Sequence, residues 1–133
     1  MPLKLTRGQR NNNPLNIRVG NKWKGLRQPN TDGAFDQFIA TQWGYRAAFV
    51  CLKNYINKHK CNTVRKIIYR WAPPNENVTG AYINTVCKRT GFSPDQEIKP
   101  NYDDLSLLVS AMAYVESRDY PTSSMLSYAW NLI

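Results

Sequence analysis

The sequence is poor in the residues from which metal sites and disulfide frameworks are built. It has one histidine, His59, in the polar run NKHKCN, and three cysteines without CxxC spacing: Cys51, Cys61 and Cys87. An odd number of cysteines at such spacings predicts neither a disulfide framework nor a zinc ribbon. The apolar neighbours of Cys51 favour a buried, unreactive thiol. We therefore expect no metal ion and no organic cofactor.

Long apolar runs are also missing. No run approaches the roughly 18 residues that a membrane-spanning helix needs, and the opening MPLKLTRGQRNNN lacks the apolar segment of a secretory signal. We expect no membrane span, and synthesis in the cytoplasm without a signal peptide. A target outside the cell would then require a trimmed signal, another export route or release by lysis.

Acidic residues are scarce in the first half of the chain. Residues 1–71 carry fourteen Lys or Arg against two acids, a net charge of +12, whereas residues 72–133 carry four against seven, a net charge of −3. Such a basic half should attract polyanions. Nucleic acid, an anionic membrane surface and an acidic cell-wall polymer such as peptidoglycan all fit, and charge alone does not choose among them. No nucleic-acid-binding motif is visible, although Arg, Lys and Trp mix in RVGNKWKGLR.

The remaining composition is that of a globular domain. The 133 residues include 42% apolar residues, and a chain of this size can bury about two thirds of the surface that it exposes when unfolded. We predict one domain, residues 1–133, of the mainly α (α+β) class. The first forty residues are rich in Asn, Gly and Pro and favour loops, with short β-prone pieces at LNIRV and FDQFI that predict a small β element near the N-terminus.

Apolar residues recur at helical spacing after residue 40. Five helices are expected, with start and stop signals at most ends. They are Thr41–Lys60, with Thr41 as N-cap; Thr63–Trp71, ended by Pro73 and Pro74; Thr79–Thr90, capped by Thr79 and stopped by Gly91; a helix capped by Asn101 or Asp103 and running to about Arg118; and one whose first turn holds Pro121 and that runs to the C-terminus.

A carboxylate stands at the end of the fourth of these helices, in AMAYVESRDYP. Glu116 follows Met112 by four residues and Leu108 by eight, so it shares the ridge that they should bury. Desolvation and the negative end of the helix dipole both disfavour its ionised form and raise its pKa. A raised pKa suits a general acid near neutral pH. The alternative is a helix-end Glu that has rotated to solvent or pairs with Arg118.

Three blocks of the sequence resemble known proteins. AMAYVES resembles the helix end that carries the catalytic Glu-Ser of lysozyme-like lytic transglycosylases, although Arg118 stands where that family commonly has Gly. RGQRNNNPLNIRVGNKWKG and RWAPPNENVTGAYINTV are similar to two signatures of a group of phage and Bacteroides-type virion or endolysin-like proteins with a lysozyme-like fold. The resemblance implies a lysozyme-like helical domain that cleaves peptidoglycan glycan strands, as a lytic transglycosylase or a muramidase, with Glu116 as general acid and base.

The order of these blocks is rotated relative to ordinary members of the lysozyme superfamily. There the Glu-Ser helix precedes the Asn-Pro segment, whereas here NNNP comes first and VES near the end. A circular permutation would account for this order, since the termini of a domain often lie close together. The hypothesis requires Glu116 to lie near Asn13 and Asn16.

Three further acids are candidates for a role in the reaction. Glu76, in WAPPNEN, is the second candidate for the catalytic acid, or else complements the positive end of the following helix. Asp32 and Asp36 bracket DGAFD, where a lysozyme-like fold often places its second carboxylate. We favour a turn at Asp32 with Gly33, and a solvent-facing strand position for Asp36.

Amides and aromatic rings are the candidates for substrate binding. The side chains of Asn13 and Asn16 can both donate to and accept from sugar groups. They could equally form Asx turns, and the resemblance implies structural support near a cleft for both. Flat rings stack on the apolar C–H faces of sugars, but most aromatic residues, Trp71 included, should belong to the core. The substrate-binding candidates are Asn13, Asn16, Trp23, Tyr82 and Tyr120.

Two other classes of function stay open. A non-catalytic virion structural or cell-wall-binding module would keep the fold without the reaction, and the absence of Gly after Ser117 favours it. A nucleic-acid-binding protein would explain the basic first half. For the leading hypothesis we expect a monomer that acts on peptidoglycan or another anionic polysaccharide, at the cell wall or periplasm or as a virion component.

Overall fold

The computed structural model describes residues 4–72 and 76–133, without the side chains of Glu76 and Asn77. This part of the chain is mainly helical, as predicted. Its helices are α1 (Arg7–Arg10), α2 (Thr41–His59), α3 (Val64–Trp71), α4 (Glu76–Thr90), α5 (Tyr102–Ser117) and α6 (Ser123–Asn131).

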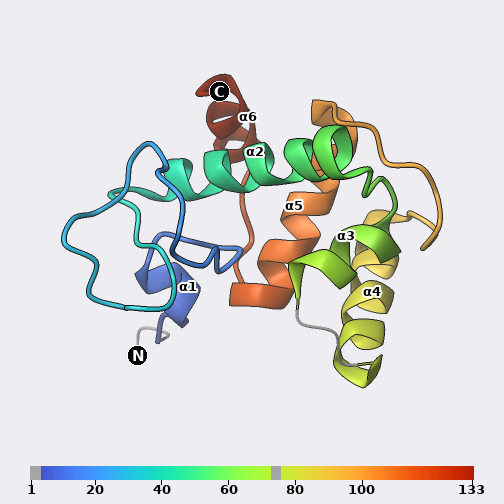
Figure 1. Cartoon of the computed structure of the whole chain (residues 1–133), viewed down its shortest axis with the longest axis horizontal. Helices are drawn as coiled ribbons and strands as arrows, with labels where there is room; N and C mark the ends of the chain where they lie inside the picture. The colour runs from blue at the N-terminus through green and yellow to red at the C-terminus, as the bar shows by residue number, and fades with distance from the viewer. Residues whose placement is uncertain (1–3, 73–75) are drawn as a thin grey trace.

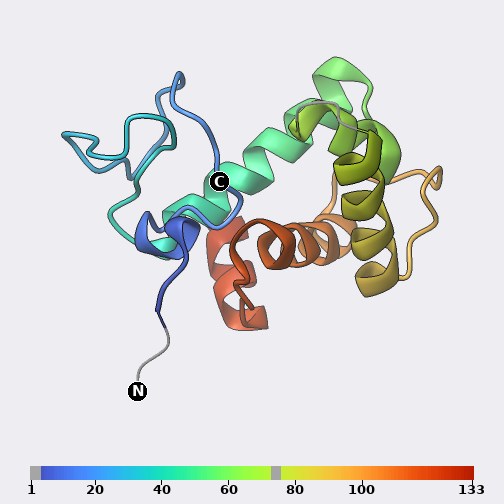
Figure 2. The ribbon, with the colours of Figure 1, turned by 90° about the horizontal axis from the view of Figure 1, so that it is seen from below.

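Helices α2 and α5 form the centre of the molecule. They cross in Figure 1, with α1 and the N-terminal loops at one end of the pair and α3 and α4 at the other, and Figure 2 shows the same division from below. Phe49 and Leu52 of α2 and Leu108 and Met112 of α5 are fully buried in one core cluster. The same cluster includes residues of α3, α4 and α6, so burial of apolar surface holds the helices to one core.

Two helix starts and one helix stop follow the sequence signals. The side chain of Thr63 accepts a hydrogen bond from Lys66 N at the start of α3, and that of Asn101 accepts one from Asp104 N at the start of α5. Each satisfies a backbone N–H that the helix itself leaves unpaired. Gly91 follows α4 with φ of +83°, the left-handed conformation that glycine adopts without a steric penalty.

Three predicted helix starts are wrong. The N-cap of α2 is Ala40, because Thr41 Oγ1 instead donates to Asn12 Oδ1 at 3.1 Å in a tertiary contact. Helix α4 begins at Glu76, so Thr79 lies inside it, where the full burial of this threonine outweighs its preference for a cap. Pro121 precedes α6, because Thr122 caps that helix through its hydroxyl.

The small β element predicted near the N-terminus is also wrong. Among the described residues the two β-prone pieces form no strand and make only isolated antiparallel bridges, Arg18 with Phe35 and Leu26 with Phe38. Beside the bridge bond from Asp36 N to the Ile17 carbonyl at 2.9 Å, an amide side chain joins the two pieces: Asn13 Nδ2 donates to the carbonyls of Ile17 and Asp36, both at 2.9 Å. The backbone is therefore paired without a regular sheet.

Candidate functional site

An open groove of about 620 Å³ lies between the N-terminal loops and the helices, with Glu116 in its wall. Loop residues form one side, and residues of α2, α3, α4 and α5 form the other. The lining residues are Asn16, Ile17, Arg18, Val19, Asn21, Phe35, Cys51, Tyr55, Trp71, Ala72, Val78, Tyr82, Val115 and Glu116.

Glu116 is the penultimate residue of α5, and both of its carboxylate oxygens accept hydrogen bonds. Asn16 Nδ2 donates to Oε1 at 3.2 Å, and the Tyr82 hydroxyl donates to Oε2 at 3.1 Å. Burial raises the pKa of Glu116, and it outweighs these two hydrogen bonds and the charge of Arg18, which lower the pKa. The position of Glu116 on the helix predicted a raised pKa, and the pKa is raised. The carboxyl group therefore keeps its proton to a higher pH than an ordinary glutamate does.

The backbone of Asn16 sets the direction of its side chain. Asn16 has φ of +52°, in the left-handed region that asparagine enters more readily than most residues. Its Nδ2 donates to the carbonyl oxygen of Glu116 at 3.2 Å as well as to the carboxylate. The amide therefore joins the N-terminal loops to the last turn of α5, and its Oδ1 is buried without a hydrogen-bond partner among the described residues.

Asn13 is a structural residue and does not line the groove. Its side chain is fully buried, and besides its two donated bonds it accepts one from Ile17 N at 2.9 Å. These bonds fix the turn that carries Asn16. Asn13 is therefore not accessible for the predicted contact with substrate.

Two glycines let the asparagine-rich segment approach the helices. A Cβ at Gly8 would lie 1.8 Å from Ser117 Oγ, and a Cβ at Gly44 would lie 2.1 Å from the carbonyl oxygen of Asn12. Neither distance is possible between non-bonded atoms. The glycines thus hold α1 against the end of α5, and the NNNP turn against α2, as closely as the groove requires.

Tyr82 connects the carboxylate to α4. It is 7% exposed, and burial, followed by the charge of Glu116 and their hydrogen bond, raises its pKa well above the usual value. The hydroxyl is therefore protonated throughout the physiological range and is available as a hydrogen-bond donor to Glu116.

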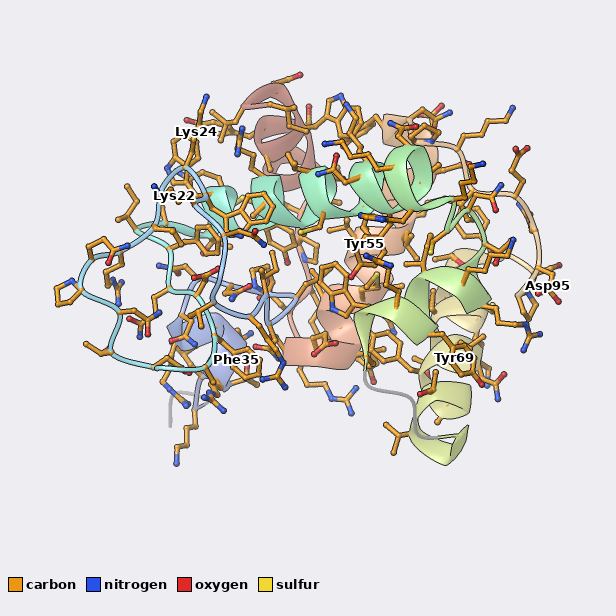
Figure 3. The ribbon with its side chains drawn as sticks, viewed as in Figure 1. Lys22, Lys24, Phe35, Tyr55, Tyr69 and Asp95 are labelled. Carbon is orange, nitrogen blue, oxygen red and sulfur yellow. The ribbon has the colours of Figure 1, made fainter. Side chains whose placement is uncertain are left out.

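Aromatic rings that the sequence did not single out line the groove. Trp71 and Tyr55 lie with ring centroids 5.7 Å apart, and Trp71 Nε1 donates to the carbonyl of Leu15 at 3.3 Å. In Figure 3, Tyr55 lies beneath α2 and Phe35 beside the N-terminal loops. Trp71 was predicted to be core, and its position at the end of the amphipathic α3 was the available signal that one face of the ring could be open.

The two aspartates of DGAFD do not line the groove. Asp32 accepts hydrogen bonds from Arg7 Nε at 2.8 Å and from Asn11 Nδ2 at 2.9 Å, and these hold its pKa far below the usual range. The expected solvent-facing position of Asp36 is wrong, because this residue is 5% exposed and burial raises its pKa. Its backbone is tied to the turn of Asn13, which carries the side chain inward.

The groove also contains a thiol. Burial, with a smaller contribution from the charge of Asp36, raises the pKa of Cys51 to about 12. The thiol therefore stays protonated near neutral pH and is a poor nucleophile. This agrees with the inert role expected of Cys51.

The remaining candidates lie elsewhere. Trp23 is partly buried and packs against the core cluster, and Tyr120 is 68% exposed, with its ring centroid 5.5 Å from that of Tyr114. Neither lines this groove. The side chain of Glu76 lies outside the described residues, so its candidacy stays a prediction.

The described residues form neither a metal-binding cluster nor a membrane-spanning helix. No group of three or more His, Cys, Asp or Glu side chains in residues 4–72 and 76–133 is placed to hold a metal ion. No helix in the same part of the chain is long and apolar enough to cross a membrane.

Comparison with known proteins shows a similarity to a phage protein. No protein-family model matches the chain. The sequence is 37% identical over 119 residues to Protein P5 of Pseudoalteromonas phage PM2, an alignment that covers 86% of this chain and 73% of the relative.

Proposed function

The chain belongs to the family of Protein P5 of Pseudoalteromonas phage PM2, and we propose that it cleaves the glycan strands of peptidoglycan. The proposed fold is lysozyme-like, and the proposed general acid is Glu116. The phage origin of the relative is compatible with a protein that meets the bacterial cell wall as a virion component or at lysis. The name of the relative carries no activity, so the chemistry is inferred from the groove.

One observation carries the proposal: Glu116 is a desolvated carboxylate with a raised pKa in the wall of a groove that also holds aromatic rings. Glycosidic cleavage needs a proton on the leaving oxygen, and a carboxyl group whose pKa is raised by burial is better suited to supply it than an ordinary glutamate. Tyr55 and Trp71 offer flat faces on which sugar rings can stack. The basic N-terminal half adds attraction for the acidic wall polymer.

Glu116 would act twice in the reaction. As the acid it protonates the glycosidic oxygen as that bond breaks, and Asn16 and Tyr82 then stabilise the carboxylate that forms through their hydrogen bonds. As the base it removes a proton from the attacking hydroxyl, which belongs to the sugar itself in a transglycosylase and to water in a muramidase. Among the described lining residues Glu116 is the sole carboxylate, which favours the transglycosylase, since that mechanism needs no second acid.

The proposed circular permutation is supported by the contact between Asn16 and Glu116. These residues stand 100 positions apart in the sequence and share two hydrogen bonds. A permuted lysozyme-like domain would keep this neighbourhood while changing the order of its segments. Asn13 supports the same turn from inside.

Digestion of purified peptidoglycan tests the proposal. The wild type should release fragments, and the Glu116→Gln variant should lose at least about a hundredfold in rate, because the side chain then cannot donate its proton. Glu97→Gln, which alters an exposed glutamate away from the groove, is the matched control. Mass spectrometry assigns the reaction: anhydro-sugar ends identify a transglycosylase, and reducing ends a hydrolase. Equal digestion by wild type and Glu116→Gln would remove Glu116 as the acid.

A non-catalytic wall-binding module is the second candidate, and Arg118 favours it. The lytic transglycosylases that AMAYVES resembles commonly have Gly after Glu-Ser, whereas here Arg118 occupies the position with φ of +52°. Binding to insoluble peptidoglycan without release of fragments, by both wild type and Glu116→Gln, would establish this candidate and exclude the first.

A further inference from the structure

A second hollow adjoins the groove beside α4 and α5. This hollow measures about 530 Å³ and is lined by Val78, Ala81, Tyr82, Thr85, Tyr114, Val115 and Arg118. Val78, Tyr82 and Val115 line both spaces. Glu116 lines the groove and not the hollow, but it follows Val115 and bonds to Tyr82. Its carboxylate therefore lies beside the residues that the two spaces share.

Each space has a guanidinium group in its wall. Arg18 lies over the ring of Phe35 at 4.9 Å on the groove side, and Arg118 lies over the ring of Tyr114 at 4.5 Å on the side of the hollow. Both arginines are exposed. The ion pairs found among the described residues use Arg7 and Arg65. Arg18 and Arg118 form no such pair with a described carboxylate, although the charge of Arg18 acts on Glu116.

The position of Arg118 carries a conformational penalty. It is the C-cap of α5 with φ of +52° and ψ of +32°, a left-handed conformation in which a side chain crowds the backbone and glycine does not. A second guanidinium, that of Arg89, lies 3.9 Å from the ring of Tyr114. The C-cap of α5 thus presents a cation in the wall of the hollow.

We propose that the groove and the hollow form one cleft for an acidic glycan strand that passes across Glu116. Arg18 binds a carboxylate of the strand on one side of the bond to be cleaved, and Arg118 binds one on the other. Planar guanidinium groups bind carboxylates through paired hydrogen bonds, which fix position as well as charge. The inference rests on the proposed function and adds two consequences: the ligand carries carboxylates on both sides of the bond, and cleavage occurs within strands and not at their ends.

Binding measurements test the two arginines apart from catalysis. The probe is soluble, uncrosslinked peptidoglycan strand with free carboxylates, titrated into Glu116→Gln protein, alone and with Arg18→Gln, Arg118→Gln or Arg27→Gln added. Arg27 is an exposed arginine outside both spaces, and its substitution removes the same charge. Arg18→Gln and Arg118→Gln should each weaken binding about tenfold, as expected for the loss of a charged hydrogen bond, whereas Arg27→Gln should leave it nearly unchanged. The same strands with amidated carboxylates should bind all four proteins equally weakly.

The outcomes separate this inference from the proposed cleavage. Strands that bind with this dependence on arginine but are not cleaved by the wild type would remove the cleavage and keep the cleft. Cleavage that depends on Glu116, together with equal binding by all three arginine variants, would remove the cleft assignment and keep the cleavage. With active protein, early products of many lengths support cleavage within strands, and early release of single repeating units contradicts it. Absence of both binding and cleavage overturns both proposals.

Discussion

Asn16 donates its side-chain amide to both the carboxylate and the carbonyl oxygen of Glu116, at 3.2 Å each, across 100 residues of sequence. One contact thus fixes the end of α5 against the N-terminal loops and places a hydrogen-bond donor on a buried acid. The hydrogen bond favours the ionised form of Glu116, whereas burial favours the protonated form. The pKa of this residue follows from the balance of the two.

Replacing Asn16 should raise the pKa of Glu116. Asn16→Gly keeps a residue suited to φ of +52° and removes the amide, so one of the groups that lower the pKa of Glu116 is lost. We expect the pKa of Glu116 to rise further, as measured by NMR titration of its side-chain carboxyl carbon. Asn12→Gly is the matched control, since Asn12 also has φ of +52° and its side chain bonds to Phe38 and Thr41. An unchanged or lower pKa in Asn16→Gly would show that the amide does not stabilise the carboxylate.

The stability of the protein should depend on pH through Glu116. Its pKa is raised in the folded state above the usual value of 4.5, so the folded protein binds more protons than the unfolded chain at pH values between the two. The stabilisation is complete below pH 4.5 and is lost as the pH rises through the folded pKa. Glu116→Gln removes this titration. The variant should gain stability relative to the wild type between pH 4 and pH 7, measured by urea unfolding at both values. A gain that is the same at both pH values would contradict the assignment.

The close approach of α1 to α5 can be tested at Gly8. A Cβ there meets Ser117 Oγ at 1.8 Å and the carbonyl oxygen of Asn13 at 2.9 Å, so Gly8→Ala should destabilise the protein by about 1–3 kcal/mol. Gly80 lies inside α4, where a Cβ would meet no heavy atom within 4 Å, and Gly80→Ala should instead stabilise the protein by up to about 1 kcal/mol. Urea unfolding measures both. Equal changes in the free energy of unfolding for Gly8→Ala and Gly80→Ala would show that the contact at Gly8 is not tight.

Two helix ends with the same geometry allow the strain at Arg118 to be measured. Lys60 caps α2 with φ of +54°, and Arg118 caps α5 with φ of +52°. Substitution by Gly should remove the strain of each left-handed residue, which costs about 1 kcal/mol. Arg118→Gly also loses the contact with Tyr114, which contributes about 0.5 kcal/mol at an exposed site. We expect Lys60→Gly to gain more thermal stability than Arg118→Gly, and only the latter to weaken strand binding. Loss of stability in both variants would show that neither backbone is strained.

Local signals predicted the helices better than the loops. The apolar spacing of residues 41–60 and 101–118 matched α2 and α5, because a helix that buries one face repeats that face in its sequence. The starts of α2 and α4 were wrong where tertiary contacts took Thr41 and Thr79 out of capping roles. The short helix α1, capped by Thr6 and Gln9, was missed because four residues carry almost no periodicity.

Asp36 and Trp71 show the limits of predicting the site from the sequence. Alternation placed Asp36 in solvent, but the turn of Asn13 binds its backbone and buries its side chain. Helical spacing placed Trp71 in the core, and this residue does pack against the core cluster, but it is only partly buried and also lines the groove. The exposure of a side chain depends on which segments pack together, and the local sequence pattern does not determine this packing.

By itself the sequence determined a mainly helical chain, a basic first half and a carboxylate on the buried ridge of a helix end, because periodicity and charge are properties of neighbouring residues. Only the tertiary structure decided that this carboxylate would lie beside Asn16 and Tyr82 in a groove, with Arg18 in the wall of that groove and Arg118 in the wall of the adjoining hollow. This arrangement depends on the packing of segments that are distant in the sequence. The glycines at positions 8 and 44 permit that packing, but no single segment specifies it.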